Sequence, residues 1–319
     1  MTRLTRRSLL AASATALLTT PTFAAPPQLT IKKAKIVGKI TESLLKPLQQ
    51  TGFDGVETTH VCDEPEAAVG KAVAERLNMR VHSVLRGWMD FNSPDPKQVE
   101  ASLEATRKAL RAAKAYGADA ILLVPCRVSK IAMPEPWEFK IEFDEKTGHV
   151  TRVADGADAN EKYAAYIAAQ NRATDTSRAA VEKLIPLAQE LGVVIGLENV
   201  WNNLWVDPRL YRHFVASFNS PWAKAYFDIG NVVKYSMPDK WITELGAGQI
   251  CKLHVKDFKL NPDGHNGKFV HPGDGSIDWP AVRAALAAAK YQGWATIEDN
   301  GLSLDEFSKR FDTLINGKA

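Results

Sequence analysis

Short, continuously apolar segments alternate with helix-like segments along this chain, and that alternation restricts the fold more than any other feature. The apolar segments are expected to be strands, at residues 32–38, 54–59, 79–85, 120–126, 193–199, 224–229, 250–257 and 294–299. Most of them lack the period-two polarity of half-exposed strands, which is typical of parallel strands buried on both faces. Eight such strands alternating with helices predict an α/β fold, a single-domain (β/α)8 TIM barrel.

The segments between the strands have residues that typically begin and end helices. Helices are expected at residues 43–50, 65–77, 96–116, 159–191, 208–218, 238–245, 279–291 and 304–315. Several of them begin with proline after a polar residue, which is the usual place of proline in a helix. Gly117 and Gly192 directly follow two of the expected helices, at the position where glycine commonly ends a helix. The long segment 159–191 is a candidate for a break, near Thr174 and Asp175 or at Pro186.

Residues 138–153 predict a hairpin inserted after the fourth strand. Phe139, Ile141 and Phe143 alternate with polar residues, and Thr147 and Gly148 form a turn signal. The insertion follows the C-terminal end of a strand, on the side where barrels of this kind carry their sites. Two interpretations are open, a surface ornament or dimer contact and a partial lid. We favour the first because insertions of this kind are common in surface loops.

The first 24 residues have the pattern of a twin-arginine export signal. Arg6 and Arg7 precede the apolar run 9–18, and Ala24 ends a small-residue cleavage site. The run is too short, and too interrupted by serine and threonine, for a transmembrane anchor. We therefore expect an exported, periplasmic protein with a mature barrel at 25–319.

The charge of the mature chain argues against some partners. The whole sequence has 40 basic and 37 acidic residues, and the signal contains three arginines and no acid. Its removal leaves a formal charge of zero, which gives no electrostatic basis for binding nucleic acid or an anionic membrane. Cys62, Cys126 and Cys251 lie in or beside apolar runs, so buried thiols are expected rather than disulfides. A homo-oligomer remains open.

Four side chains capable of binding a metal lie at the ends of the last four strands. They are Glu198, Asp228, His254 and Glu298. The C-terminal strand ends of a TIM barrel converge on one mouth, so we expect these groups to meet there. Three carboxylates and one imidazole suit one divalent cation, Mn²⁺ first, with Mg²⁺, Co²⁺ or Zn²⁺ as alternatives.

The chain resembles the sugar phosphate isomerase/epimerase superfamily, with its xylose isomerase-like TIM barrel, and most of all its ketose 3-epimerases and pentulose-phosphate 3-epimerases. The resemblance rests on G-F-D-G-V-E (52–57), G-L-E-N (196–199), F-D-I-G-N (227–231), L-H-V-K-D (253–257), G-D-G-S-I-D-W (273–279) and I-E (297–298). It implies a divalent-metal-dependent sugar epimerase or isomerase that moves a proton on a ketose or keto-sugar through an enediolate. Glu198 and Glu298 would be both metal ligands and catalytic acid and base, and Asp228 and His254 would be ligands only.

Substrate-binding residues are expected around the same mouth. The candidates are Asn231, Lys256, Glu57, His82, Trp201 and Asn202, with Arg86 and Trp88 after the third strand. Aromatic rings that stack on a sugar and amides that bind its hydroxyls would form a carbohydrate pocket. Other roles are open for several of them: a buried ion pair for Glu57, a core histidine for His82, a solvated charge for Lys256, and core or lid packing for the tryptophans.

Two departures from the ketose 3-epimerase pattern leave the sugar undefined. Asn231 stands where many of these enzymes have histidine, and Lys259 and Leu260 stand where they carry an arginine beyond the histidine ligand. Export favours an unphosphorylated substrate. The same proton abstraction could instead serve a 3-keto-glycoside lyase or a sugar dehydratase, and a non-catalytic exported sugar-binding protein is a further alternative. A DNA-repair relative is disfavoured because it needs many histidine ligands and a basic surface.

Overall fold

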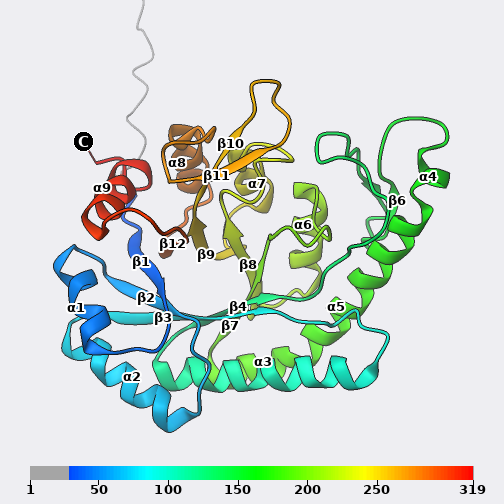
Figure 1. Ribbon diagram of the computed structural model, residues 1–319. Helices are drawn as coiled ribbons and strands as arrows, with labels where there is room; N and C mark the ends of the chain where they lie inside the picture. The colour runs from blue at the N-terminus through cyan, green and yellow to red at the C-terminus, as the bar shows by residue number, and fades with distance from the viewer. Residues whose placement is uncertain (1–28, 319) are drawn as a thin grey trace, which may run out of the picture.

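The computed structural model describes residues 29–318, and in it eight parallel strands close into a barrel surrounded by helices (Figure 1). The strands follow one another around the barrel in the order β1-β12-β9-β8-β7-β4-β3-β2. They are β1 (Lys32–Val37), β2 (Gly55–Thr58), β3 (Arg80–Trp88), β4 (Ala120–Val124), β7 (Val194–Glu198), β8 (Ala223–Asp228), β9 (Ile250–Val255) and β12 (Trp294–Ile297). This confirms the (β/α)8 barrel and all eight expected strands. The expected export signal at residues 1–24 lies outside the described residues.

The helices also lie close to their expected positions. They are α1 (Glu42–Gln50), α2 (Glu64–Arg76), α3 (Pro96–Tyr116), α4 (Ala159–Lys162), α5 (Ala164–Leu191), α6 (Pro208–Ser217), α7 (Pro238–Leu245), α8 (Trp279–Ala288) and α9 (Leu304–Leu314). The break in the long segment lies at Tyr163, not at either position expected from the sequence. Helix α5 continues through Thr174, and it also tolerates Pro186 in its interior.

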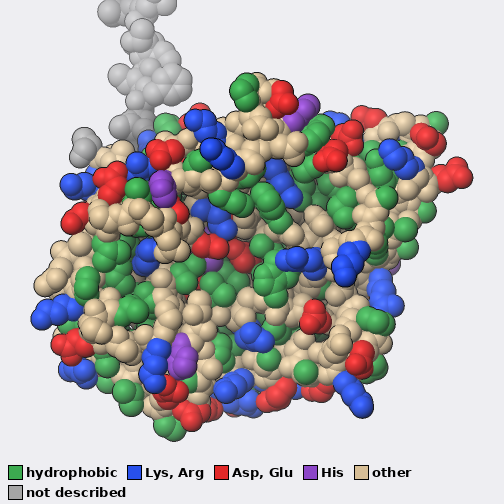
Figure 2. Space-filling view, in the orientation of Figure 1, with side chains coloured by type: hydrophobic (Ala, Val, Ile, Leu, Met, Phe, Trp, Pro, Cys, Tyr) green, Lys and Arg blue, Asp and Glu red, His purple; other side chains and the backbone are tan. Residues whose placement is uncertain are grey.

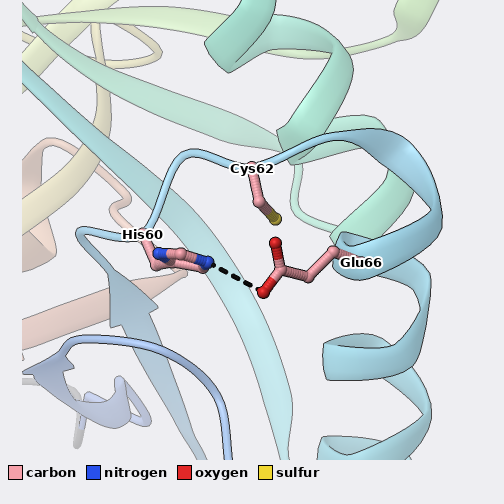
Figure 3. Close-up of side chains that lie close together, drawn as sticks. All are labelled: His60, Cys62 and Glu66. Carbon is pink, nitrogen blue, oxygen red and sulfur yellow. Dashed lines mark hydrogen bonds and ion pairs between the residues drawn. The ribbon is translucent and has the colours of Figure 1, made fainter.

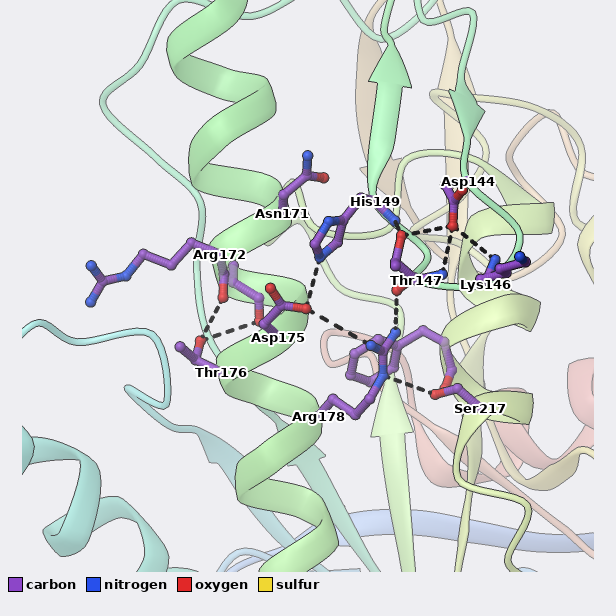
Figure 4. Close-up of polar contacts among 12 residues, drawn as sticks. Asp144, Lys146, Thr147, His149, Asn171, Arg172, Asp175, Thr176, Arg178 and Ser217 are labelled. Carbon is purple, nitrogen blue, oxygen red and sulfur yellow. Dashed lines mark hydrogen bonds and ion pairs between the residues drawn. The ribbon is translucent and has the colours of Figure 1, made fainter.

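The inserted hairpin is present and is bound to the outside of the barrel. Its strands β5 (Glu142–Phe143) and β6 (Val150–Arg152) pair antiparallel. Asn171 of α5 exchanges two hydrogen bonds with the backbone of Val150, and His149 Nε2 lies 2.8 Å from Asp175 Oδ1 (Figure 4). Arg178 donates to the carbonyl oxygen of Thr147 at 2.8 Å. These contacts with α5 favour the interpretation of the hairpin as a surface ornament.

A second hairpin, which the sequence analysis missed, follows β9 at the mouth. Strands β10 (Asp257–Leu260) and β11 (Gly267–Val270) pair antiparallel, with their turn at 261–266. The strand expected at 250–257 is shorter in the structure and ends at Val255, because the chain leaves the barrel at Lys256. The segment N-P-D-G-H-N-G (261–267) is rich in turn residues and could have indicated the hairpin. None of the helices in the described part of the chain is long and apolar enough to span a membrane.

The barrel has a large apolar core between strands and helices and a more polar interior. The inner apolar cluster contains only Leu122, Val124 and Tyr226 among fully buried residues. Beside it, Glu57, His82 and Thr296 are completely buried within the barrel. Because buried polar groups need partners, this interior can hold side chains in fixed orientations beneath the mouth.

Candidate active site and metal centre

The four predicted ligands meet at the C-terminal mouth of the barrel. Glu198 and Asp228 are the last residues of β7 and β8, His254 lies near the end of β9, and Glu298 follows β12. One ligand atom from each lies within 4.8 Å of all the others. His254 Nδ1 lies 2.8 Å from Glu298 Oε2 and 3.3 Å from Glu198 Oε1. Acidic side chains and a histidine gather in the middle of this face, with lysine and arginine side chains around them (Figure 2).

The unpaired atoms of this cluster fit a cation. Asp228 Oδ2, His254 Nδ1 and Glu298 Oε2 are buried and make no hydrogen bond of acceptable geometry, although they approach one another closely. Buried polar atoms without hydrogen bonds are costly, and Lys256 is the one lysine or arginine of the described residues that pairs with them, so three such atoms gathered around one point favour a further shared partner. A divalent ion bound to oxygen and imidazole nitrogen satisfies this requirement, and these four side chains would hold it.

A carboxylate behind His254 fixes the orientation of its ring. Glu57 Oε2 accepts a hydrogen bond from His254 Nε2 at 2.7 Å and another from the Tyr226 hydroxyl at 2.9 Å. Ser83 Oγ donates to the other oxygen of Glu57 at 3.2 Å. With the proton on Nε2, the lone pair of Nδ1 faces the cluster, which is the arrangement that orients histidine ligands in metal proteins.

Lys256 compensates the negative charge of the site. Its Nζ lies 2.9 Å from Glu298 Oε2 and 3.2 Å from Asp228 Oδ2. Lys256 therefore lies on the same side of the chain as His254 and points to the mouth. Burial would raise the pKa of Glu298, but His254 and Lys256 outweigh it and hold that pKa well below its usual range. Burial raises the pKa of Asp228 to about 7, with Lys256 opposing the shift.

Backbone contacts hold the strand ends in register. The Asn199 side chain accepts from the backbone N–H of Asp228 at 2.8 Å and donates to its carbonyl oxygen at 2.7 Å, which clips β7 to β8. The backbone N–H of Asn231 donates to Asp228 Oδ1 at 2.7 Å. A Cβ atom on Gly230 would lie 2.5 Å from Lys256 Cγ, so glycine is needed there for the lysine to reach the cluster.

The structure brings Asn231 and Trp201 to the mouth but leaves their contact with substrate a prediction. Trp201 Nε1 donates to the carbonyl oxygen of Asn231 at 2.8 Å, and its ring packs against Phe258 and Phe269 of the second hairpin. The side-chain nitrogen of Asn231 is buried without a partner. An amide with a free donor beside the metal ligands can bind a sugar hydroxyl.

Three other predicted substrate residues make contacts within the protein, and their contact with substrate stays a prediction. Both oxygens of Glu57 already have protein donors, so Glu57 positions His254. His82 is fully buried, stacks on Trp294 and lies 2.9 Å from Thr296 Oγ1, as a core histidine does. Asn202 is fully buried and accepts from the backbone of Leu204 at 3.0 Å, while its side-chain nitrogen has no partner in the protein. Sequence position could not reveal these contacts because most of the partners lie far away in the chain.

A second group of possible ligands lies in the loop after β2 and already has protein partners. His60 and Glu66 form an ion pair at 3.2 Å, and Cys62 points towards them (Figure 3). Lys39 also pairs with Glu66, and Cys62 Sγ lies 3.2 Å from the Tyr116 hydroxyl. Because each side chain is satisfied by the protein, nothing here requires a metal.

Comparisons with known proteins agree with the fold. A family model described as a xylose isomerase-like TIM barrel matches residues 45–309. Among solved structures, a D-tagatose 3-epimerase-like protein superposes with a TM-score of 0.64 at 18% identity, over 88% of this chain and 95% of that one. The 3-keto-D-glucoside 4-epimerase YcjR from E. coli gives a TM-score of 0.60 at 14% identity, over 89% of this chain and 99% of that one.

Curated sequences match only parts of the chain. L-ribulose-5-phosphate 3-epimerase UlaE of Salmonella paratyphi C is 33% identical over 88 residues, which is 28% of each protein. An uncharacterised protein of Methanocaldococcus jannaschii is 24% identical over 151 residues, covering 45% of this chain. The chain thus spans between about a quarter and a half of the length of these relatives. A solved IOLI protein with a bound zinc atom has a TM-score of 0.61 at 16% identity, over 89% of this chain and 96% of that one.

Proposed function

The chain belongs to the xylose isomerase-like TIM barrel family, and from this premise we propose that it is a divalent-metal-dependent sugar epimerase or isomerase acting on a ketose or keto-sugar. One observation carries the proposal: Glu198 of β7 and Glu298 beside β12 lie 3.3 and 2.8 Å from His254 Nδ1, in a cluster whose buried atoms lack hydrogen bonds. The printed names of structural neighbours, which include a D-tagatose 3-epimerase-like protein and a 3-keto-D-glucoside 4-epimerase, support the same reaction class.

The chemistry follows from the two glutamates. A bound divalent ion would polarise a carbonyl and acidify the neighbouring C–H. One carboxylate then takes the proton from the carbon beside the carbonyl, and the other returns a proton to the opposite face or to the neighbouring atom. His254 and Lys256 lower the pKa of Glu298, so Glu298 is ionised at neutral pH, as a base must be. Asn231 and Lys256 would bind hydroxyl and carbonyl oxygens of the sugar.

The proposed reaction is tested by NMR in D₂O. The mature protein, loaded with Mn²⁺ for activity and exchanged into Mg²⁺ for spectroscopy, is incubated with ketoses and 3-keto-glycosides. We expect a new epimer or isomer with deuterium at the carbon beside the carbonyl. Release of an aglycone or loss of water would favour the lyase or dehydratase alternative, and binding without any turnover would favour the non-catalytic one.

Matched variants assign the two bases. Glu198→Gln and Glu298→Gln should each lower turnover by about 10²–10⁴, the usual contribution of general acid–base catalysis, with further loss from the missing ligand charge. Glu161→Gln, at an exposed position in α4, is the control and should keep wild-type activity. Near-normal turnover in both site variants would exclude the two-glutamate mechanism.

We also infer that the protein is exported by a twin-arginine signal at residues 1–24 and works in the periplasm. The support is the Arg6-Arg7 pattern and the apolar run that follows it. Intact mass spectrometry of the protein from its native host should give an N-terminus at or near Ala25. An unprocessed cytoplasmic chain would contradict this inference.

A further inference from the structure

The second hairpin forms one wall of a cavity that reaches the candidate active site. The cavity has a volume of about 610 Å³, within the usual range of small-molecule sites. Strands β10 and β11 of this hairpin extend outward from the end of β9 (Figure 1). Lys259, Lys268 and Phe269 of the hairpin line the cavity together with Lys256 and Glu298 of the candidate active site. A ligand bound at Glu298 can therefore reach the hairpin without leaving the cavity.

Two lysines of the hairpin lie directly opposite each other, and we call them the lysine pair. In the antiparallel pairing of β10 with β11, Lys259 is the partner of Lys268. The Cβ atoms of residues paired in this way are about 5 Å apart, and their side chains lie on the same face of the ladder. Like charges in this arrangement destabilise a sheet. An anion that binds to both ammonium groups would remove this repulsion.

The carboxylates of the cavity do not neutralise the lysine pair, because each of them has another partner. Glu298 is engaged within the candidate active site. Asp299 Oδ2 lies 2.6 Å from His271 Nδ1, and Asp274 Oδ1 lies 2.8 Å from an Arg310 nitrogen. Within residues 29–318, no carboxylate forms an ion pair with either lysine of the pair. The hairpin wall of the cavity therefore has two positive charges that are available to a ligand.

An aromatic ring gives the same wall an apolar surface. Phe269, next to Lys268 in β11, lines the cavity with 45% of its surface exposed. Its ring packs against Trp201 at 5.0 Å, and Lys256 Nζ lies 5.2 Å from its centre. Aromatic rings of this kind stack on the carbon skeleton of a sugar. The wall thus suits a sugar that carries a negative charge better than an inorganic anion alone.

We propose that Lys259 and Lys268 bind an anionic group, a carboxylate or a phosphate, at the end of the sugar remote from the reacting carbons. The substrate is then an anionic keto-sugar. This inference rests on the proposed function for the position of the sugar, whose carbonyl end would lie beside Glu298. Lysine binds both kinds of anion as a point charge, so the shared chemistry is the negative charge itself. The proposed export favours the carboxylate.

The test compares the binding of sugars that differ at one carbon. Calorimetry on the Mg²⁺-loaded mature protein measures the affinities of D-fructuronate, D-fructose 6-phosphate and D-fructose, and of D-tagaturonate and D-tagatose. Both lysines are exposed, so we expect a moderate preference: the uronate or the phosphate should bind about 10-fold more tightly than its neutral parent. The preference should shrink as NaCl is raised, because salt screens exposed charges. The stronger of the two anions identifies which group the site takes.

Variants of the lysine pair test its role. The double variant Lys259→Gln/Lys268→Gln should bind anionic and neutral sugars equally well, whereas Lys259→Arg/Lys268→Arg should keep the preference. Lys108→Gln, at an exposed lysine on α3, is the control and should also keep it. Without ligand, Lys259→Gln alone should melt at or above the wild-type temperature, because it removes a like charge opposite Lys268.

The possible results separate this inference from the proposed function. Equal binding of anionic and neutral sugars by the wild type, no binding of any anionic sugar, or a preference that persists in the double glutamine variant would each overturn the inference. Calorimetry needs no turnover. Tight binding of an anionic sugar through the lysine pair without any reaction in D₂O would reject the proposed function and leave this inference standing. Turnover of neutral and anionic sugars with equal affinity would do the reverse.

Discussion

At the scale of single residues, His82 makes the barrel interior sensitive to acid. Burial lowers its pKa well below the usual 6.5, and Lys252 and His254 lower it further. His82 is therefore protonated below about pH 6.5 in the unfolded chain but stays neutral in the folded chain. The free energy of unfolding consequently falls as the pH decreases below 6.5. Above that pH the residue is neutral in both states and contributes no pH dependence.

Replacing His82 should remove this dependence. His82→Phe can keep the stacking on Trp294 while losing the bond to Thr296 and the titrating group. Between pH 6.5 and 5 we expect the wild type to lose up to about 1.4 kcal/mol of unfolding free energy per pH unit relative to this variant. Urea unfolding at each pH measures it, with His265→Gln in the exposed hairpin turn as the control. Parallel pH profiles for wild type and His82→Phe would contradict the prediction.

The cluster of candidate ligands could be predicted from sequence, and the residues that position these side chains could not. Glu198, Asp228, His254 and Glu298 end consecutive apolar strands, and the fold alone brings strand ends together. The role of Glu57 depends on a hydrogen bond to a residue 197 positions away. No local pattern records such a contact, so the sequence left an ion pair and substrate binding equally open for Glu57.

At the scale of elements, the parallel strands were predictable because burial on both faces makes them continuously apolar. The short strands β10 and β11 were not, since two of their eight residues are lysine and only Phe258 is fully buried among their apolar side chains. The irregularity in β3, where the pairing with β4 shifts between Leu85 and Gly87, could not be predicted either. An extra residue in a strand does not change the strand's apolar composition.

The loop after β11 depends on a carboxylate that clasps its backbone. Asp257 Oδ2 accepts from the backbone N–H groups of Gly273 and Gly275 at 2.9 and 3.2 Å, so Asp257 orients this strand-end loop. A Cβ atom on Gly275 would lie 1.9 Å from Asp257 Oδ1, in a place where the surrounding backbone is also close.

Gly275→Ala should therefore break this clasp. The displaced carboxylate would lose its backbone donors, and we expect a loss of about 1–3 kcal/mol of unfolding free energy, the usual cost of overpacking or of a buried unpaired polar group. Gly38→Ala is the control, because its Cβ would meet no atom within 4 Å. Chemical denaturation of both variants measures the difference. A Gly275→Ala protein as stable as Gly38→Ala would show that the loop does not depend on Asp257.

At the scale of the whole molecule, the metal-free barrel should remain folded because its own cations balance the site. Lys256 pairs with Asp228 and Glu298. Burial alone would lower the pKa of His254, but the carboxylates of Glu57 and Glu298 outweigh burial and raise that pKa well above its usual value. Carboxylates that repelled one another without such partners would open the mouth.

Metal removal should consequently lower the melting temperature without unfolding the protein. A ligand present at 100 times its dissociation constant adds about 2.7 kcal/mol to the folded state, which corresponds to roughly 5 °C or more for a chain of this size. We expect that shift when Mn²⁺ is added to chelator-treated protein, and none in Asp228→Asn, which retains shape but loses a ligand charge. Asp305→Asn in the exposed first turn of α9 should respond like the wild type. An equal Mn²⁺ shift in Asp228→Asn would mean that the ion binds elsewhere. Unfolding on chelation would mean that Lys256 and His254 do not suffice to hold three carboxylates together at the mouth.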